Sequence, residues 1–170
     1  MDHTTFISHN ARPAIRIERT LGYPASHVWE ALNIPEQTRH WFPSELTVEP
    51  RVGGVVRFSG DPNTADSTGT VLAFDRPRLL AFTWGGNELR FDLTDEAPAE
   101  TGFVLTNVLD ADDEAARNAA GWDVCLAELE RYLAGGETAG PHGESALSWQ
   151  DRYDHFVALG LPSGAAIPGA

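Results

Sequence analysis

The chain has 170 residues, 42% hydrophobic and 22% charged, which is typical of one globular domain with a short tail. Its net charge of −13 argues against nucleic acid and anionic membranes as partners, because phosphate binding needs clustered cations. All 12 basic residues are arginine, which excludes a lysine Schiff base, a P-loop lysine and a lysine general base.

The first part of the chain predicts one strand and two short helices. Residues 1–13 are expected to form a flexible N-terminus. Residues 14–21 alternate apolar and polar side chains, which indicates a strand with one buried face. Residues 27–34 predict a short amphipathic helix, and a second short helix is expected over residues 35–42, with Pro35 at its start and a proline after its end.

The middle of the chain predicts an antiparallel meander of strands joined by short turns. The expected strands lie at residues 45–50, 55–60, 69–75, 78–84, 88–94 and 102–110. Large apolar residues alternate in 78–84 and again in 88–94, on either side of a Gly85-Gly86-Asn87 turn, so both strands should bury one face. The last strand carries apolar residues on both faces, Phe103 and Leu105 on one and Val104 and Val108 on the other. The sequence therefore does not determine which face points inward.

A long amphipathic helix is predicted after the meander, since apolar residues recur there at spacings of three and four. The stripe consists of Ala115, Ala119, Trp122, Leu126, Leu129 and Leu133. Gly135 and Gly136 end this helix, which is the expected cover for the sheet. Residues 136–170 predict a linker and a tail with a short aromatic amphipathic helix, which packs on its own domain, contacts a second copy or acts as a lid.

A set of motifs occurs in a distinctive order along the chain. It consists of Val28-Trp29-Glu30-Ala31-Leu32, Trp41-Phe42, Val52-Gly53-Gly54, Gly69-Thr70-Val71-Leu72, Pro77, Leu80-Ala81-Phe82-Thr83-Trp84 and Gly121-Trp122. This order resembles the START/Bet v 1-like (SRPBCC) superfamily, specifically bacterial proteins similar to the C-terminal domain of the activator of Hsp90 ATPase. The resemblance covers residues 14–134. It implies an α+β helix-grip fold over residues 14–135, with a curved antiparallel sheet of six to seven strands around a long C-terminal helix.

The resemblance also implies a hydrophobic cavity between the sheet and the long helix. The side chains expected to line it are Trp41, Phe42, Val56, Phe58, Leu72, Phe74, Leu80, Phe82, Trp84, Leu89, Phe91, Trp122, Leu126 and Leu129. These side chains are bulky, so they either surround a ligand-sized space of ~300–1,000 Å³ or fill it as a solid core. The sequence leaves both outcomes open.

No catalytic or metal-binding motif stands out. Cys125, between apolar neighbours on the long helix, is expected to be a buried thiol with a raised pKa. The six histidines show no metal-ligand spacing, and His40, at the expected cavity mouth, is interpreted as exposed or helix-terminal. Glu88, Asn107 and Tyr132 could reach the cavity ends, with structural roles. We expect no catalytic residue, no metal and no cofactor.

The sequence therefore predicts a binding protein for a small apolar molecule, with the physiological ligand open. A cyclase/aromatase-type enzyme acting in the same cavity and a chaperone-associated or regulatory protein–protein module are the alternatives. A monomer or homodimer without membrane insertion is expected. The first residues lack the pattern of a secretory signal, and the single cysteine excludes an intrachain disulfide, so a cytoplasmic location is predicted.

Overall fold

The computed structural model describes residues 3–144 and 147–169. Its strands are β1 (His3–His9), β2 (Arg12–Leu21), β3 (Glu45–Val48), β4 (Val55–Ser59), β5 (Ser67–Asp75), β6 (Leu79–Trp84), β7 (Asn87–Ala97) and β8 (Glu100–Val108). Its helices are α1 (Ala25–Asn33), α2 (Pro35–Thr38), the 3-10 turn η1 (Asp112–Glu114), α3 (Ala115–Leu133) and α4 (Trp149–Ala158).

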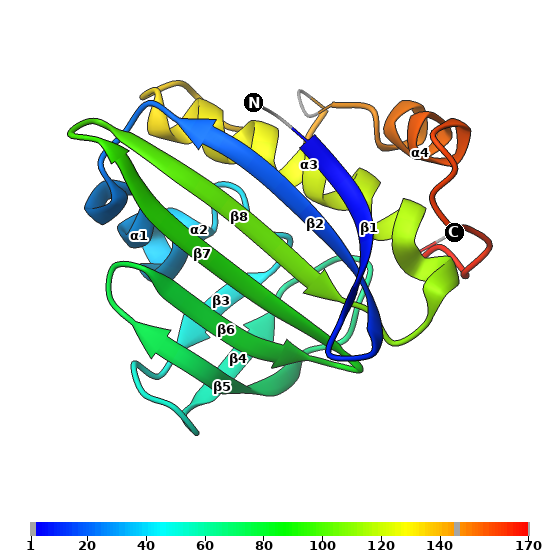
Figure 1. Cartoon of the computed structure of the whole chain (residues 1–170), viewed down its shortest axis with the longest axis horizontal. Coiled ribbons are helices and arrows are strands. Elements are labelled where there is room, and N and C mark those ends of the chain that lie inside the picture. Colours follow the sequence, from blue (N-terminus) through cyan, green and yellow to red (C-terminus); the bar gives the residue numbers. More distant parts are fainter. Residues whose placement is uncertain (1–2, 145–146, 170) are drawn as a thin grey trace.

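The strands form one antiparallel sheet in the order β1-β2-β8-β7-β6-β5-β4-β3. In Figure 1 this sheet lies in front and the long helix α3 runs behind it, with α1 and α2 beyond one end of α3. The α+β helix-grip fold predicted from the sequence is confirmed, including the six-strand meander from β3 to β8 and the single long helix that follows it.

The sheet has eight strands, so the expected number of six to seven is corrected. The additional strand β1 comes from the segment expected to be a flexible N-terminus, and it pairs with β2 from His3 opposite Glu18 to His9 opposite Arg12. The hairpin turn uses Asn10 and Ala11 at positive φ values of 49° and 63°. Hairpin turns of this kind usually contain Asn-Gly, which is absent here. The strand also buries neither face fully, so its sequence lacks the apolar alternation that indicates a strand.

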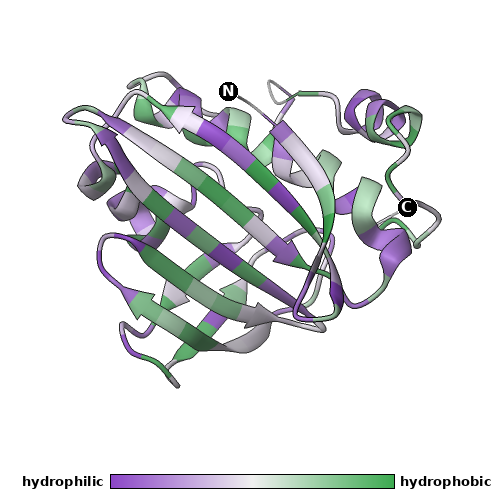
Figure 2. Cartoon of the chain, viewed as in Figure 1, coloured by the Kyte–Doolittle hydropathy of each residue, from purple (hydrophilic) through white to green (hydrophobic). Residues whose placement is uncertain are grey.

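The core lies between α3 and one face of the sheet. Leu80, Phe82, Leu89 and Phe91 are each at most 1% exposed, as the alternation in β6 and β7 predicts. Figure 2 shows the corresponding alternation of hydrophobic and hydrophilic bands along β7. The open question about β8 is also answered, because Phe103 and Leu105 join this core and the Phe103 ring lies 6.1 Å from that of Phe91.

The tail packs on its own domain. Helix α4 begins at the predicted cap, where Asp151 N donates to Ser148 Oγ over 3.3 Å, and Phe156 on its inner face is only 2% exposed. Arg152 reaches from α4 to α3 and pairs with Asp123 at 2.6 Å. Beyond α4 the chain returns along the first turn of α3, where Ala116 N donates to Pro162 O (Figure 1).

Candidate functional site

The middle of the helix grip is a solid aromatic core. The rings of Phe58 and Trp84 stack at 5.2 Å, and Phe42 lies 5.3 Å from Trp84 and 5.8 Å from Trp122. Most of the side chains expected to line a cavity pack against one another in this core, namely Trp41, Phe42, Val56, Phe58, Leu80, Phe82, Leu89, Phe91, Leu126 and Leu129. Large side chains therefore fill this part of the space between helix and sheet.

Two of the expected lining residues lie elsewhere. Leu72 is 43% exposed, which contradicts its assignment to the cavity. The pairing of β5 with β6 shifts register between Val71 and Ala73, so Val71 takes the inward position and Leu72 points outward. Phe74 is half-buried and its ring packs edge-on against Trp29 at 5.3 Å.

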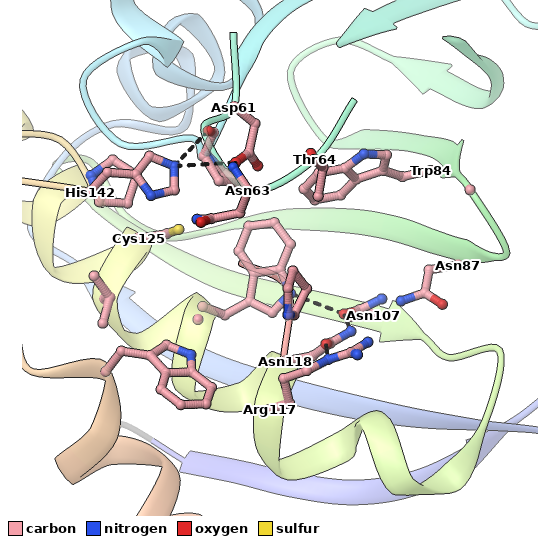
Figure 3. A pocket seen from close by; sticks show the side chains of 18 of the residues that line it. Asp61, Asn63, Thr64, Trp84, Asn87, Asn107, Arg117, Asn118, Cys125 and His142 are labelled. Atoms are coloured by element: carbon pink, nitrogen blue, oxygen red, sulfur yellow. Dashed lines mark hydrogen bonds and ion pairs between the residues drawn. The ribbon is translucent and has the colours of Figure 1, made fainter. Parts of the chain in front are cut away.

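A pocket of about 570 Å³ opens beside the aromatic core. Its walls come from the loop after β4, the β6–β7 turn, the end of β8, the first half of α3 and the tail (Figure 3). The lining residues are Pro43, Asp61, Asn63, Thr64, Ala65, Ser67, Trp84, Gly85, Asn87, Asn107, Arg117, Asn118, Gly121, Trp122, Val124, Cys125, Pro141, His142, Trp149, Ile167 and Pro168. Of the set expected from the sequence, this pocket includes Trp84 and Trp122.

The tail forms one wall of this pocket. Trp149 opens α4 beside Gly121, and Ile167 and Pro168 line the pocket from the last described residues. Gly169, at φ 78°, lies so close to Asn63 that a Cβ there would collide with the Asn63 side chain. The tail thus reaches from α3 to the loop after β4, and the enclosure depends on it.

Asn107 organises the end of the pocket where β8 meets α3. Its Oδ1 accepts hydrogen bonds from Trp122 Nε1 at 3.0 Å and Asn118 Nδ2 at 3.1 Å, and its Nδ2 donates to the carbonyls of Glu88 and Val108. The side chain is 1% exposed and all its hydrogen-bonding capacity is used. Asn107 therefore holds the Trp122 indole in place, which agrees with the structural role predicted for it.

Arg117 is also fully engaged. Its Nη2 pairs with Glu114 at 3.1 Å, its Nη1 donates to Ala166 O at 2.6 Å, and its Nε donates to Asn118 Oδ1 at 3.1 Å. Glu114 neutralises the charge, and the remaining hydrogen bonds fasten the tail to α3. Arg117 is thus committed to the wall of the pocket.

A carboxylate and an imidazole lie close together on the opposite side of the pocket. Asp61 Oδ1 accepts a hydrogen bond from Asn63 N at 2.7 Å and lies 3.8 Å from His142 Nε2. That His142 nitrogen donates to Pro43 O at 2.8 Å, so its hydrogen is directed at the carbonyl (Figure 3). The Asp61 side chain is 8% exposed although it faces the pocket.

Cys125 lines the pocket from α3 and is 4% exposed. Burial raises the pKa of its thiol well above the ordinary value, and the negative charge of Asp61 raises it further. The thiol is therefore protonated at neutral pH, as the sequence predicts. Among the described residues, no three histidine, cysteine or acidic side chains come together as metal ligands.

The sequence missed most of the polar lining. Asp61 and Asn63 fall in a turn-rich loop and His142 in a glycine-rich linker, where no periodicity reports which way a side chain points. His40 lies outside the pocket, stacked on Tyr132 at 4.6 Å. Glu88 pairs with Arg12 at 3.1 Å, so Asn107 alone of the three cavity-end candidates faces the pocket.

The family model for "Activator of Hsp90 ATPase homolog 1-like protein" matches residues 22–134. The chain belongs to this family. The match ends one residue after α3, so the tail that walls the pocket lies outside the matched region. No curated protein matches the sequence.

Solved structures share the fold of this family member at low identity. A conserved protein of unknown function from Enterococcus faecalis, EF2215, is 22% identical with a TM-score of 0.76, covering 92% of this chain and 89% of its own. CalU16 from Micromonospora echinospora is 20% identical with a TM-score of 0.69, covering 94% and 96%. DynU16, a protein in the dynemicin biosynthetic locus, is 24% identical with a TM-score of 0.63, covering 74% and 48%.

Proposed function

We propose that this protein binds a small, largely apolar molecule in the pocket between α3, the loop after β4 and the tail. The observation that carries the proposal is the pocket itself, whose 570 Å³ falls among the volumes of small-molecule sites. Three tryptophans, Trp84, Trp122 and Trp149, contribute to its walls. Such aromatic surface offers a ligand a large apolar contact area.

The location of the pocket supports the same conclusion. Protein interiors are normally packed without gaps, and the aromatic rings next to the pocket are packed in this way. The side chains around the pocket therefore leave a space that close packing elsewhere in the core does not.

No helix of the described residues is long and apolar enough to cross a membrane. A cytoplasmic location and a monomeric or homodimeric state stay predictions, which cell fractionation and light scattering would measure.

Gly121 offers a sharp test with a matched control. It lines the pocket from α3, and a Cβ at this position would meet only Trp149 Nε1, at an ordinary 3.9 Å. Gly121→Phe should fill the pocket with a ring while leaving the helix intact. Gly121→Ala should keep the pocket open and stabilise α3 by up to about 1 kcal/mol, because alanine is the better helix former.

The measurement is quenching of tryptophan fluorescence by naphthalene-based probes, supported by native mass spectrometry. Wild type and Gly121→Ala are expected to bind with similar affinity, and Gly121→Phe is expected to bind at least tenfold more weakly. Circular dichroism checks that both variants are folded. Equal binding by all three proteins would place the ligand elsewhere, and absence of binding to the wild type would refute the proposal.

Acid–base catalysis in the same pocket is a second candidate function, favoured by the proximity of Asp61 and His142. A carboxylate and an imidazole in one pocket are the groups needed to move a proton at a carbon next to a carbonyl. Hydrogen–deuterium exchange of 2-tetralone in D2O, followed by NMR, tests this. Exchange should be faster with wild type than with His142→Gln, and a wild-type rate equal to buffer alone would eliminate the candidate.

A further inference from the structure

We propose that the pocket is selective for apolar molecules that carry a positively charged amine, with Asp61 as the residue that recognises the charge. This inference rests on the proposed function and adds the chemical class of the ligand. The geometry behind it is a buried carboxylate on the wall of an aromatic pocket, with part of its hydrogen-bonding capacity unused.

Arg117 and Asp61 lie at opposite sides of the pocket and differ in how much of their charge and hydrogen-bonding capacity is unused. Arg117 is neutralised by Glu114 at 3.1 Å, and its other nitrogens donate to Ala166 and Asn118. An anionic ligand would have to displace these contacts. The wall formed by Arg117 therefore provides no free cation for a carboxylate or phosphate.

Asp61 lacks a comparable partner. Among the described residues the one basic side chain within 4 Å of it is His142, at 3.8 Å, and the hydrogen on that nitrogen is donated to Pro43 O at 2.8 Å. The hydrogen bonds of the described residues give Asp61 Oδ1 one donor, Asn63 N, and give Oδ2 none. The carboxylate thus retains an acceptor oxygen and a negative charge beside the pocket.

Burial increases the effect of that charge. The Asp61 side chain is 8% exposed, so water screens it poorly and a cation bound in the pocket would interact with it strongly. Its negative charge also contributes to the raised pKa of the Cys125 thiol, which lines the same pocket. Three tryptophans also line the pocket, and indole is the side-chain ring that attracts cations most strongly. The chain's net charge of −13 steers cations toward the protein.

The test uses three probes of one shape: 1-naphthylmethylamine, 1-naphthylmethanol and 1-naphthoate. Dissociation constants are measured at pH 7 and low ionic strength by tryptophan quenching or calorimetry. Wild type should bind the amine about tenfold more tightly than the alcohol, because one charge-assisted hydrogen bond contributes about that factor in affinity. It should bind the carboxylate most weakly of the three probes. This comparison needs no variant.

Asp61→Asn assigns the selectivity to the carboxylate, since the amide keeps the shape and removes the charge. The ratio of amine to alcohol affinity should fall to within about threefold, with alcohol binding little changed. Asp66→Asn is the matched control, because Asp66 belongs to the same loop, accepts from Gly60 N and does not line the pocket. It should keep the wild-type ratio.

The outcomes separate the two proposals. If the alcohol binds as tightly as the amine, or the carboxylate binds best, the inference about charge is overturned and the binding function stands. If Asp66→Asn lowers the ratio as much as Asp61→Asn, the preference comes from overall charge and Asp61 is not its source. If none of the three probes binds, both the binding function and its selectivity are refuted.

Discussion

Replacing Asn107 by leucine tests whether the end of the pocket is held by one buried amide. The substitution removes the oxygen that accepts from Trp122 Nε1 at 3.0 Å and from Asn118 Nδ2 at 3.1 Å, and it also removes the weaker 3.3 Å hydrogen bonds from Asn107 Nδ2 to the carbonyls of Glu88 and Val108. Trp122 is 5% exposed, so its N–H loses its partner without gaining water, which costs about 1–3 kcal/mol. Asn118 is half-buried beside the pocket and can be rehydrated, so its lost hydrogen bond adds about 1 kcal/mol.

The expected loss of unfolding free energy is therefore about 2–3 kcal/mol, after some recovery from the apolar leucine. For a chain of this length that lowers the melting temperature by about 4–12 °C. Urea unfolding followed by far-ultraviolet circular dichroism measures the change, since the fluorescence of Trp122 is itself perturbed. The contribution of the pair is isolated by repeating Asn107→Leu in a Trp122→Phe background, where no indole N–H is stranded.

The double-mutant cycle should give a coupling of about 1 kcal/mol or more, because the two side chains share a hydrogen bond. A loss below about 0.5 kcal/mol in the wild-type background would show that Asn107 does not support the fold. An equal loss in both backgrounds would show that the cost comes from something other than the contact with Trp122. Either result would refute the account of this end of the pocket.

Three other predictions address the core, the thiol and the tail. Phe91→Ala, in the aromatic core, should lower the free energy of unfolding by about 3–5 kcal/mol. Leu72→Ala should change it by less than about 0.5 kcal/mol, because Leu72 is exposed. Equal losses for the two variants in urea unfolding would contradict the register shift in β5. Cys125 of the folded protein should react with Ellman's reagent at pH 8 at least tenfold more slowly than free cysteine, because burial keeps the thiol protonated. In urea the same thiol should react rapidly. Fast reaction of the folded protein would contradict the burial of Cys125. Truncation after residue 140 should preserve the circular dichroism signal of the sheet. It should weaken binding of the naphthalene probes by more than tenfold, because one wall of the pocket is removed. Unchanged affinity would show that the tail is not part of the site.

Periodic patterns predicted the parts of the fold that bury one face. The alternation in β6 and β7 and the helical stripe through Trp122 placed both sides of the core correctly. The patterns failed where the backbone departs from regular geometry. The register shift at Val71 turned Leu72 outward, and the turn at Asn10 and Ala11 created a strand without the glycine that marks such turns.

The candidate site was harder to predict because it lies where periodicity stops. Asp61 belongs to a loop and His142 to a linker, and the two residues are far apart in the sequence and meet only in the folded chain. The predicted lining residues were apolar, and apolar side chains are those that pack into a core wherever space allows. The pocket of this protein consequently lies where loops and tail keep helix and sheet apart, and Asp61, Asn63 and His142 come from those segments.

Hydrogen-bond capacity then separates Asn107 and Arg117, which support the pocket, from Asp61, which we propose as the charged group that a ligand contacts. Asn107 has both acceptor positions and both donors in use, and Arg117 has its charge and all three nitrogens in use. The Asp61 side chain is 8% exposed, less deeply buried than Asn107, and keeps one oxygen without a donor among the described residues. A carboxylate that lies mostly out of water on a pocket wall can accept a hydrogen bond from a bound cation, and the cation then compensates its charge. Asp61 is therefore the charged group on this wall that a cationic ligand would complete: Asp61→Asn should leave the free protein folded and no less stable even as it removes the preference for amines, and destabilisation of the free protein by Asp61→Asn would give the carboxylate a purely structural role.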